Sequence, residues 1–292
     1  MSTAIIINPI AGGASPRAAR ARQQLARAIV DAGGTPVEVL VTEGVGHARE
    51  LAKAAVRRGA RLVLAWGGDG TINEIASALA FDEAALGIIP AGSGNGLARE
   101  LGVHWRADTA IADAMQAEPR RMDLGEIDGR LFANMAGTGF DAHIASQFAT
   151  APRRGFVGYA GITARALRSY QPQHYTVTTG GVETEHRAVL VTIANSAQFG
   201  NNARIAPGAR VDDGELDLVV VEERSRFATM CQMPRLFNGT IERVRGCTIR
   251  RIREVTIESD QPMTYHVDGE PVAGGTMLRA RVHPGALRIA VR

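Results

Sequence analysis

Lysine is almost absent from this chain, and its scarcity argues against two large classes of nucleotide-using enzyme. Lys53 is the only lysine, and all other Lys/Arg positions are arginine. P-loop NTPases and protein kinases hold phosphates with a lysine in a fixed motif, whereas Lys53 lies in LAKAAVRRG, outside any such motif. Arginine suits bidentate contact with phosphate, although genomic codon bias is the simpler explanation of its abundance.

Cysteine, aromatic residues and long apolar runs are also scarce. Cys231 and Cys247 have neither CxxC nor metal-ligand spacing, so no disulfide framework is expected and a reducing cytoplasm fits. Aromatic residues make up 5% of the chain, too few for single-stranded nucleic-acid binding by stacking, and we expect no nucleic-acid partner. The seven histidines show no zinc-ligand spacing.

No stretch approaches the roughly 18–20 apolar residues of a spanning helix, and the N-terminus lacks the basic region of a signal peptide. We expect any membrane contact to be peripheral, at the inner face. Oligomeric state has no signature here, and a homodimer stays an open alternative.

The 292 residues suffice for two domains. In the first half, strand-like and helix-like segments alternate, which predicts parallel βαβ units with right-handed crossovers. The expected strands are 4–8, 37–42, 61–66 and 86–90, and the expected helices are 16–30, 47–58, 70–79 and 95–101.

Beyond residue 121 the pattern becomes mainly β-like. Asp128–Gly129 between apolar runs predicts a hairpin. Further strands are expected at 175–179, 188–194, 216–221, 254–258, 277–282 and 287–291, with helices only near 158–169 and 226–237. We expect an α/β domain over 1–121, with 284–292 packing back onto it, and a mainly antiparallel β-sandwich over 122–283.

Three glycine-rich loops follow predicted parallel strands, at Asn8–Gly13, Gly67–Gly70 and Gly92–Gly96. Ligands of such sheets bind at the carboxyl ends of the strands. Glycine lets the backbone approach phosphate closely, and the following helix N-terminus favours negative charge. The pattern predicts a nucleotide-phosphate site, in which Asp69 is suited to hold Mg²⁺ or orient a hydroxyl. An ordinary strand–turn–helix corner, with Thr71 as a cap, is the alternative.

Six segments in order resemble the diacylglycerol kinase catalytic-domain family, which includes bacterial lipid kinases, sphingosine kinases and ceramide kinases. They are NPIAGG (8–13), GGDGTINE (67–74), PAGSGNGLARELG (90–102), NMAGTGFDA (134–142), APGARVDDGELDLVVV (206–221) and VDGEP (267–271). GGDGT alone is shared with NAD kinases and phosphofructokinases, whereas the ordered set is specific. The resemblance implies an NAD kinase/phosphofructokinase-like first domain that binds nucleotide and a second domain that binds the lipid substrate.

The resemblance also implies roles for individual positions. Asp69 matches the aspartate linked to catalytic magnesium, which in some members is proposed as the base, and Glu270 matches the proposed general base of bacterial members. Asp213, with the carbonyls of Arg210 and Glu215, resembles a second, structural magnesium site. The positions matching ATP-contacting segments are Asn8, Pro9, Ile10, Ala11, Gly12, Thr42, Gly67, Gly68, Asp69, Gly70, Thr71, Ile72, Asn73, Glu74 and Ser93.

Several of these positions have plainer interpretations. Glu270 follows an Asp-Gly turn and fits a surface hairpin, and Asp213 fits a solvated hairpin tip. Asp141 suits either a lipid head group or the cap of a following helix. The arginines of 243–253 and the Arg153–Arg154 pair suit either anionic lipid heads or a solvated strand face.

The sequence thus predicts a kinase that uses ATP and Mg²⁺ to phosphorylate a lipid hydroxyl. Diacylglycerol is favoured and a sphingoid base is left open, because Ser93 stands where many bacterial members carry Thr. Two alternatives are an NAD kinase-like enzyme and a catalytically silent nucleotide- or lipid-binding regulator.

Overall fold

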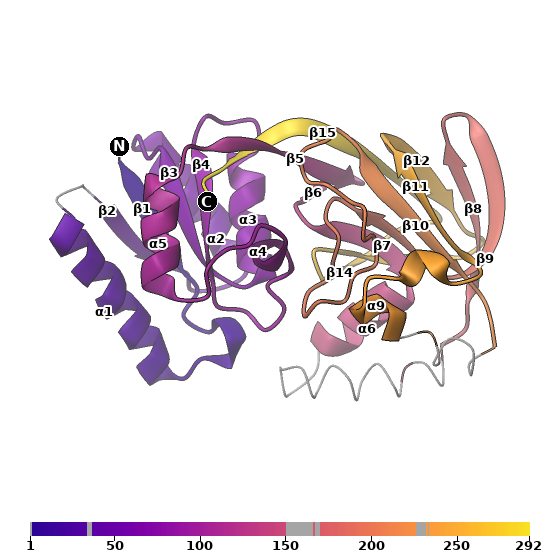
Figure 1. The fold of residues 1–292 in the computed structure, drawn as a ribbon, viewed down its shortest axis with the longest axis horizontal. Helices are drawn as coiled ribbons and strands as arrows, with labels where there is room; N and C mark the ends of the chain where they lie inside the picture. The colour runs from indigo at the N-terminus through magenta and orange to yellow at the C-terminus, as the bar shows by residue number, and fades with distance from the viewer. Residues whose placement is uncertain (1, 34–36, 150–165, 167–169, 226–231, 233) are drawn as a thin grey trace. The chain divides into compact units, whose positions relative to one another are not determined.

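Strand pairing changes from parallel to antiparallel near residue 122, where the chain divides into two units (Figure 1). Unit 1 comprises Met1–Met122 with Gly285–Arg292, and unit 2 comprises Asp123–Pro284. The computed structural model describes residues 2–33, 37–149, 166, 170–225, 232 and 234–292. The helix expected over 158–169, most of that over 226–237, and Arg153–Arg154 lie outside this description.

The sheet of unit 1 is parallel, with the strand order β2-β1-β3-β4. β1 is buried along its whole length, as its unbroken apolar run requires of a strand covered on both faces. The last residues of β15 extend the sheet beside β4, where Arg288 pairs with Ala85. The strands are β1 (Thr3–Ile7), β2 (Val37–Val41), β3 (Leu62–Gly67), β4 (Ala85–Pro90) and β15 (Met277–Ile289).

Helices cover both faces of this sheet. On one face, Ala26 and Ile111 from two helices pack against Ile5, Leu64 and alternate residues of the strands. The strand residues between these positions face the other side of the sheet and are buried as well. On that side, two further helices contact each other and the strands. The helices are α1 (Pro16–Gly33) and α5 (Ala107–Gln116) on the first face, α2 (His47–Arg57) and α3 (Asp69–Leu79) on the second, and the short α4 (Gly96–Glu100).

Helix α5 was not anticipated from the sequence. Its buried positions are Ala110, Ile111 and Ala114. Two of these three are alanines, whose small side chains give little hydrophobic contrast, so the helical period is weak in the sequence.

Unit 2 is an antiparallel β-sandwich, as predicted. The long strand β9 supplies both parts: its first half pairs with β8, and its second half pairs with β7 and β10. The strands are β5 (Arg120–Ile127), β6 (Arg130–Phe132), β7 (Met135–Gly139), β8 (Gln173–Thr179), β9 (Val182–Ala194), β10 (Leu216–Glu222), β11 (Cys247–Ile252), β12 (Glu254–Glu258), β13 (Thr264–Val267) and β14 (Glu270–Ala273). Between them lie α6 (Phe140–Ala149) and α9 (Pro234–Phe237).

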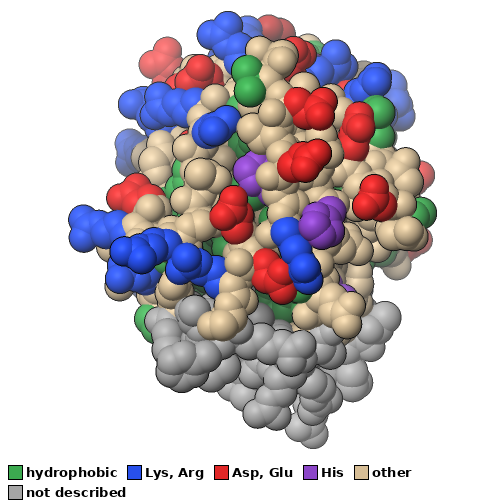
Figure 2. Space-filling model, turned by 90° about the vertical axis from the view of Figure 1, so that its right-hand side faces the viewer, with side chains coloured by type: hydrophobic (Ala, Val, Ile, Leu, Met, Phe, Trp, Pro, Cys, Tyr) green, Lys and Arg blue, Asp and Glu red, His purple; other side chains and the backbone are tan. Residues whose placement is uncertain are grey.

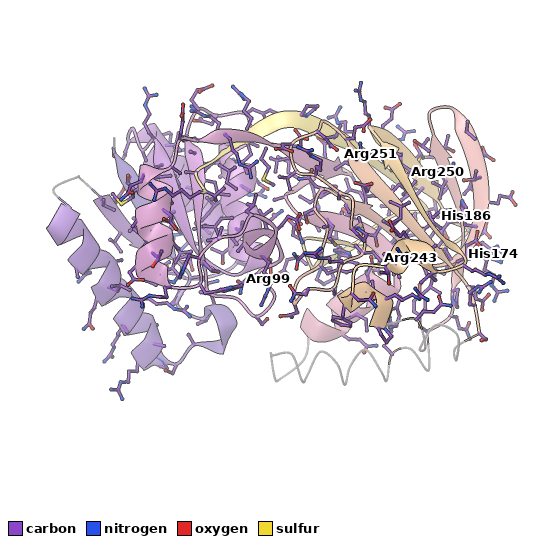
Figure 3. All side chains as sticks on the ribbon, in the orientation of Figure 1. Arg99, His174, His186, Arg243, Arg250 and Arg251 are labelled. Carbon is purple, nitrogen blue, oxygen red and sulfur yellow. The ribbon has the colours of Figure 1, made fainter. Side chains whose placement is uncertain are left out.

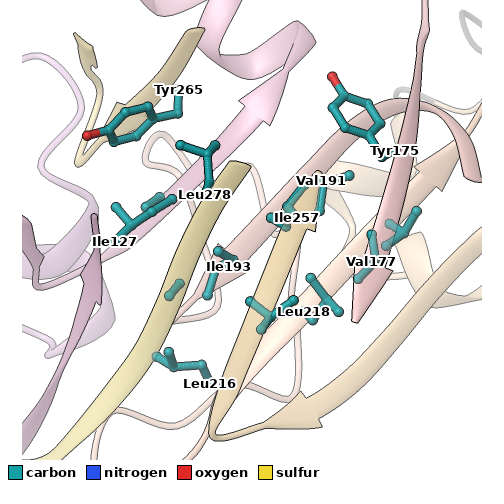
Figure 4. Close-up of a cluster of buried hydrophobic side chains, with 14 of the residues drawn as sticks. Ile127, Tyr175, Val177, Val191, Ile193, Leu216, Leu218, Ile257, Tyr265 and Leu278 are labelled. Carbon is teal, nitrogen blue, oxygen red and sulfur yellow. The ribbon is translucent and has the colours of Figure 1, made fainter. Parts of the chain in front are cut away.

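Alternating apolar residues of these strands form the core of unit 2. Figure 4 shows Val191 and Ile193 of β9 converging with Leu218 of β10, Ile257 of β12 and Leu278 of β15. The period-two pattern therefore places one face of each strand inside, which is the packing that a sandwich requires.

Three local predictions can be compared with the fold. The Asp128–Gly129 hairpin is confirmed, because both residues have positive φ and β5 pairs with β6. The two strands expected at 277–282 and 287–291 are one continuous strand, β15. Pro284 and Gly285 lie where it changes partner from β12 to β4. Helix α6 was not among the expected helices, although the cap considered for Asp141 implied a helix after that residue. Among the described residues, no helix combines the length and apolarity needed to cross a bilayer.

Candidate active site

The strand order of unit 1 places its glycine loops together. The chain leaves β1 toward β2 on one side and returns to β3 on the other, so the switch point of the sheet lies between β1 and β3. Open α/β sheets bind ligands at such a point, beyond the carboxyl ends of the strands. The loops after β1, β3 and β4 all lie at this edge.

Glycine is needed at these loops because their backbones nearly touch. A Cβ atom on Gly92 would lie 2.6 Å from the Cα of Gly68, and one on Gly68 would lie 3.1 Å from the Cα of Gly92. A Cβ on Gly12, whose φ is +68°, would overlap the carbonyl oxygen of Ala91. Such side-chain-free backbone suits close approach of phosphate oxygens, so the loops fit a nucleotide phosphate group.

The carboxylate of Asp69 joins two of the loops. Its Oδ2 accepts a hydrogen bond from the Asn95 N–H at 2.8 Å, and its Oδ1 accepts one from the Gly96 N–H at 2.7 Å. Asp69 begins α3, and Gly96 begins α4, so the carboxylate also faces the positive end of a helix. One role of Asp69 is therefore to shape the loop after β4.

Asn95 closes that same loop on itself, and sequence reasoning did not single it out. Its backbone is left-handed (φ 50°, ψ 49°) and its side chain is buried. The side-chain Oδ1 accepts from the Gly92 N–H at 2.8 Å, and Nδ2 donates to the Gly92 carbonyl at 2.7 Å. The left-handed conformation, which asparagine tolerates better than most residues, was the available signal.

Two arginines support the loops, and both were missed. Arg22 of α1 donates from its guanidinium to the carbonyls of Asn8 and Ala11, both at 3.2 Å. Partial burial lowers the pKa of Arg22. The ordinary pKa of an arginine is so high that the side chain nevertheless stays cationic at neutral pH. Arg99 (Figure 3) donates from Nε to the Gly94 carbonyl at 3.1 Å and lies over the Trp105 ring, 4.5 Å from its centroid.

Asn8 and Thr71 connect the first loop to the second. The Asn8 Nδ2 donates to Thr71 Oγ1 at 2.9 Å, and the Ile10 N–H donates to Asn8 Oδ1 at 3.1 Å. The cap role considered for Thr71 is wrong, because α3 is preceded by Gly68 and has no side-chain cap. Thr71 instead packs under Gly67, where its Oγ1 would lie 2.6 Å from an added Cβ.

Glu74 and Thr42 lie where they can support the site structurally. The Glu74 carboxylate accepts from the N–H groups of Gly46 at 2.8 Å and Ala48 at 3.0 Å, so it satisfies the start of α2. Thr42 is buried, and its N–H donates to the Ile7 carbonyl at 2.9 Å.

The other positions expected to contact ATP lie on the same loops or on α3. The Ile72 side chain is buried, whereas Ile10 is 68% exposed and presents its side chain to solvent. Ser93 is exposed, Pro9, Gly70 and Asn73 are half-buried, and Ala11 is buried.

In unit 2, the turn before Glu270 is held tightly. Asp268 (φ 47°) and Gly269 (φ 87°) form the hairpin turn between β13 and β14. The Asp268 carboxylate accepts three backbone hydrogen bonds at 2.8–2.9 Å, from the N–H groups of residues 133–135. Glu270 follows the turn with its side chain exposed to solvent.

Asp141 lies at the start of α6 with its carboxylate almost entirely buried. Its Oδ1 accepts from the Ala142 N–H at 2.7 Å, and its Oδ2 accepts from the Thr192 hydroxyl at 2.7 Å. The Nε2 of His266 lies 3.3 Å from the same Oδ2.

The acidic turn of residues 212–215 is also tied to its surroundings. Asp213 Oδ1 accepts from the Glu215 N–H at 3.2 Å, and Asp123 Oδ2 accepts from the Gly214 N–H at 2.7 Å. The Nη1 atom of Arg251 lies 3.9 Å from Asp213 Oδ2 and 3.8 Å from Glu215 Oε2. The Nη2 atom of Arg210 lies 3.4 Å from Asp212 Oδ1, and the Arg210 side chain is exposed.

Burial raises the pKa of neighbouring Asp217 to about 6. Within the described ranges, no three His, Cys, Asp or Glu side chains are grouped as a metal site.

Comparison with known proteins decides the family. The diacylglycerol kinase catalytic domain matches residues 2–127, and the YegS C-terminal NAD kinase beta sandwich-like domain matches residues 134–291. A Chromohalobacter salexigens protein named "Probable lipid kinase YegS-like" is 31% identical over 96% of this chain and 91% of its own. A Pseudomonas aeruginosa protein of the same name is 32% identical over 96% and 90%. The chain belongs to the diacylglycerol kinase catalytic-domain family.

A solved structure has the same fold as this family member. The crystal structure of a diacylglycerol kinase from Bacillus anthracis superposes with a TM-score of 0.73 and covers 100% of this chain and 97% of that one, at 20% identity. The chain is a kinase by family, and the six resembling segments fall within the two matched regions or on their borders.

Proposed function

We propose that this protein transfers the γ-phosphate of ATP to the hydroxyl of a lipid, with diacylglycerol as the favoured acceptor. The observation that carries the proposal is the joining of three glycine loops at the switch point of the unit 1 sheet. Family membership and the "lipid kinase" names of the relatives support it. A sphingoid base is the second acceptor to test, because Ser93 stands where many bacterial members of the family carry Thr.

Phosphate binding is assigned to backbone groups of the loops. Gly12, Gly68 and Gly92 let the three loops pack backbone against backbone, which leaves little side-chain bulk at the strand ends. The Gly92 N–H is bonded to Asn95 Oδ1, so the phosphate oxygens would be bound by other N–H groups of these loops. Arg22 and Arg99 donate to loop carbonyls, which fixes the loop shape and adds positive charge behind it. This preorganisation would favour a phosphate over water.

Mg²⁺ would be held by one or two carboxylates together with the phosphates, and would neutralise their charge. The Asp69 carboxylate is the candidate ligand, because it lies among the three glycine loops and carboxylate oxygens are ligands that Mg²⁺ prefers. For a second, structural ion, Asp213 offers a half-buried carboxylate, and the carbonyls of Arg210 and Glu215 are the further ligands that the family resemblance implies.

Glu270 is the better candidate for the general base. Both oxygens of Asp69 already accept hydrogen bonds from loop amides that shape the loop after β4, so proton transfer by Asp69 would compete with this structural role. Glu270 is exposed and follows a turn that Asp268 fixes with three hydrogen bonds. A base placed this way would take the proton from the acceptor hydroxyl, an effect typically worth about 10²- to 10⁴-fold.

We also propose that unit 2 meets the membrane surface through arginines near the edge strand β11. Figure 2 shows groups of basic side chains, separated by acidic ones, on the face that it presents. Arg243, Arg250 and Arg251 (Figure 3) are exposed in or beside β11, whose one partner strand among the described residues is β10. Charged residues also protect an edge strand from aggregation, so lipid binding must be measured directly. Binding to anionic vesicles that falls in Arg243→Ala/Arg250→Ala would support the contact, whereas unchanged binding would oppose it.

The decisive experiment measures ³²P transfer from ATP to diacylglycerol, sphingosine and NAD in parallel, with and without Mg²⁺. Transfer to a lipid that falls at least about 100-fold in Glu270→Gln would support both the reaction and the base. Glu258→Gln, another exposed strand glutamate of unit 2, is the matched control. Phosphorylation of NAD alone would overturn the proposal, and ATP binding without any transfer would indicate a regulator.

A further inference from the structure

A chain of buried polar groups in unit 2 runs from α6 to the turn that precedes Glu270. Its members are Thr192, Asp141 and His266, and it ends at the N–H of Gly269. The side chains of Asp141 and His266 are only 8% and 3% exposed. Buried polar groups are costly unless their hydrogen bonds are made, so a connected set such as this one specifies a single arrangement.

The sequence makes room for the Asp141 carboxylate on the surface of the sheet. A Cβ on Gly137 of β7 would lie 2.8 Å from Asp141 Oδ2, so only glycine lets the carboxylate lie there. His266 of β13 pairs with Gly137 across the ladder. The carboxylate therefore lies over one strand and beside the imidazole of the next.

The hydrogen bonds determine the tautomer of His266. The Gly269 N–H can only donate, and it points to Nδ1 of His266 at 3.3 Å, so Nδ1 must be unprotonated. A neutral imidazole then carries its proton on Nε2, which faces the Asp141 carboxylate at 3.3 Å. The carboxylate accepts this proton as a hydrogen bond, and so selects the tautomer that the turn requires.

We propose that Asp141 and His266 are positioning residues for the 268–270 turn. Asp141 fixes the tautomer and orientation of His266, and His266 Nδ1 fixes Gly269. The hydrogen bonds to the Asp268 carboxylate hold the first residue of the turn, and the bond to His266 Nδ1 holds the second. Together these bonds set the direction in which the chain continues from the turn to Glu270. The catalytic consequence rests on the proposed function, whereas the positioning itself does not.

This inference gives Asp141 a use other than contact with a lipid head group. Its Oδ1 is taken by the Ala142 N–H, and its Oδ2 by Thr192 and His266. A carboxylate with these three donors is already satisfied, so it has little to gain from a sphingoid amine.

The first test uses the full chain and no substrate. Imidazole ¹⁵N spectra at neutral pH, with the His266 signals assigned by their loss in His266→Gln, should show a protonated Nε2 and an unprotonated Nδ1. The opposite tautomer, or a doubly protonated ring, would overturn the proposal.

The second test compares two substitutions that each keep one half of the imidazole. Asparagine places its side-chain oxygen near the position of Nδ1, and glutamine places its amide near that of Nε2. His266→Asn can therefore still accept from Gly269, whereas His266→Gln keeps only the contact with Asp141. Amide exchange at Gly269 should quicken about tenfold in the Gln variant, because one hydrogen bond is lost, and change little in the Asn variant.

Activity gives the third readout. In His266→Gln, kcat for lipid phosphorylation should fall about tenfold while KM for ATP stays within about twofold, and His266→Asn should keep most of kcat. His186, a partly buried histidine of β9 bonded to Thr184, supplies the control: His186→Gln should leave kcat unchanged. Equal losses in both His266 variants would indicate a packing role and refute positioning. If the wild type phosphorylates no lipid, the proposed function fails, yet the tautomer and the Gly269 exchange still decide this proposal.

Discussion

Replacing Asp69 by asparagine tests the most connected side chain of the candidate site. The carboxylate receives the Asn95 and Gly96 N–H groups at 2.8 and 2.7 Å, one on each oxygen. Asparagine can keep one of these bonds through its oxygen. Its NH₂ group then faces the other backbone N–H, so two donors oppose each other and the loop after β4 must move.

The size of the effect follows from these contacts. A hydrogen bond to a charged group contributes about 1.5–3 kcal/mol, and a neutral one about 1 kcal/mol. Losing one charged bond and weakening the other therefore costs about 2–4 kcal/mol. At 1.36 kcal/mol per tenfold change in rate, that corresponds to about 30- to 1,000-fold. We expect turnover to fall at least ~100-fold, since any weakening of magnesium binding adds to the loss of loop order.

The unit 1 fold should survive the change, because its sheet and helices pack through a cluster of apolar side chains to which Asp69 does not belong. Steady-state ³²P transfer would measure turnover, and thermal unfolding followed by circular dichroism would measure stability. Asp82→Asn is the matched control, because Asp82 accepts the Ala84 N–H at 2.9 Å away from the glycine loops. Near-normal turnover in Asp69→Asn, or a loss that merely follows unfolding, would refute the reasoning.

Three further changes have expected outcomes of their own. Gly92→Ala places a methyl group 2.6 Å from the Cα of Gly68, so ATP affinity measured by calorimetry should fall at least about tenfold. Gly44→Ala, with open space around it, should bind ATP normally. Glu74→Gln replaces an acceptor of the two N–H groups that begin α2, and should lower the free energy of unfolding by about 1–2 kcal/mol in urea titrations. Burial raises the pKa of the Cys247 thiol to about 11, so alkylation at pH 8 should be about 100-fold slower than for a thiol of pKa 9.0. Peptide mass spectrometry would measure that rate, and fast labelling of the native protein would contradict the burial.

Much of the fold could be predicted because its signals are local. The alternation of β-branched runs with helical segments predicted the parallel sheet of unit 1, and the Asp128–Gly129 pair predicted the β5–β6 hairpin of unit 2. Helix α5 was not predicted, because its alanines give little contrast in hydrophobicity between buried and exposed positions. The bounds of β15 were misjudged for another reason. Pro284 and Gly285 usually mark the end of a strand, but here they mark a change of partner within one.

The sequence by itself determined which residue types stand at the ends of the strands, and therefore that glycine loops, an aspartate and a helix N-terminus lie at one edge of the sheet. Only the tertiary structure decided which groups these side chains bind. Asp69 bonds to amides 26 and 27 residues away, and His266 lies against a carboxylate 125 residues away. Strand and helix periods follow from neighbours in the chain, whereas a hydrogen-bond partner depends on which distant segments pack together. The sequence could therefore nominate Asp69 and Asp141, but not the contacts that define what each of them does.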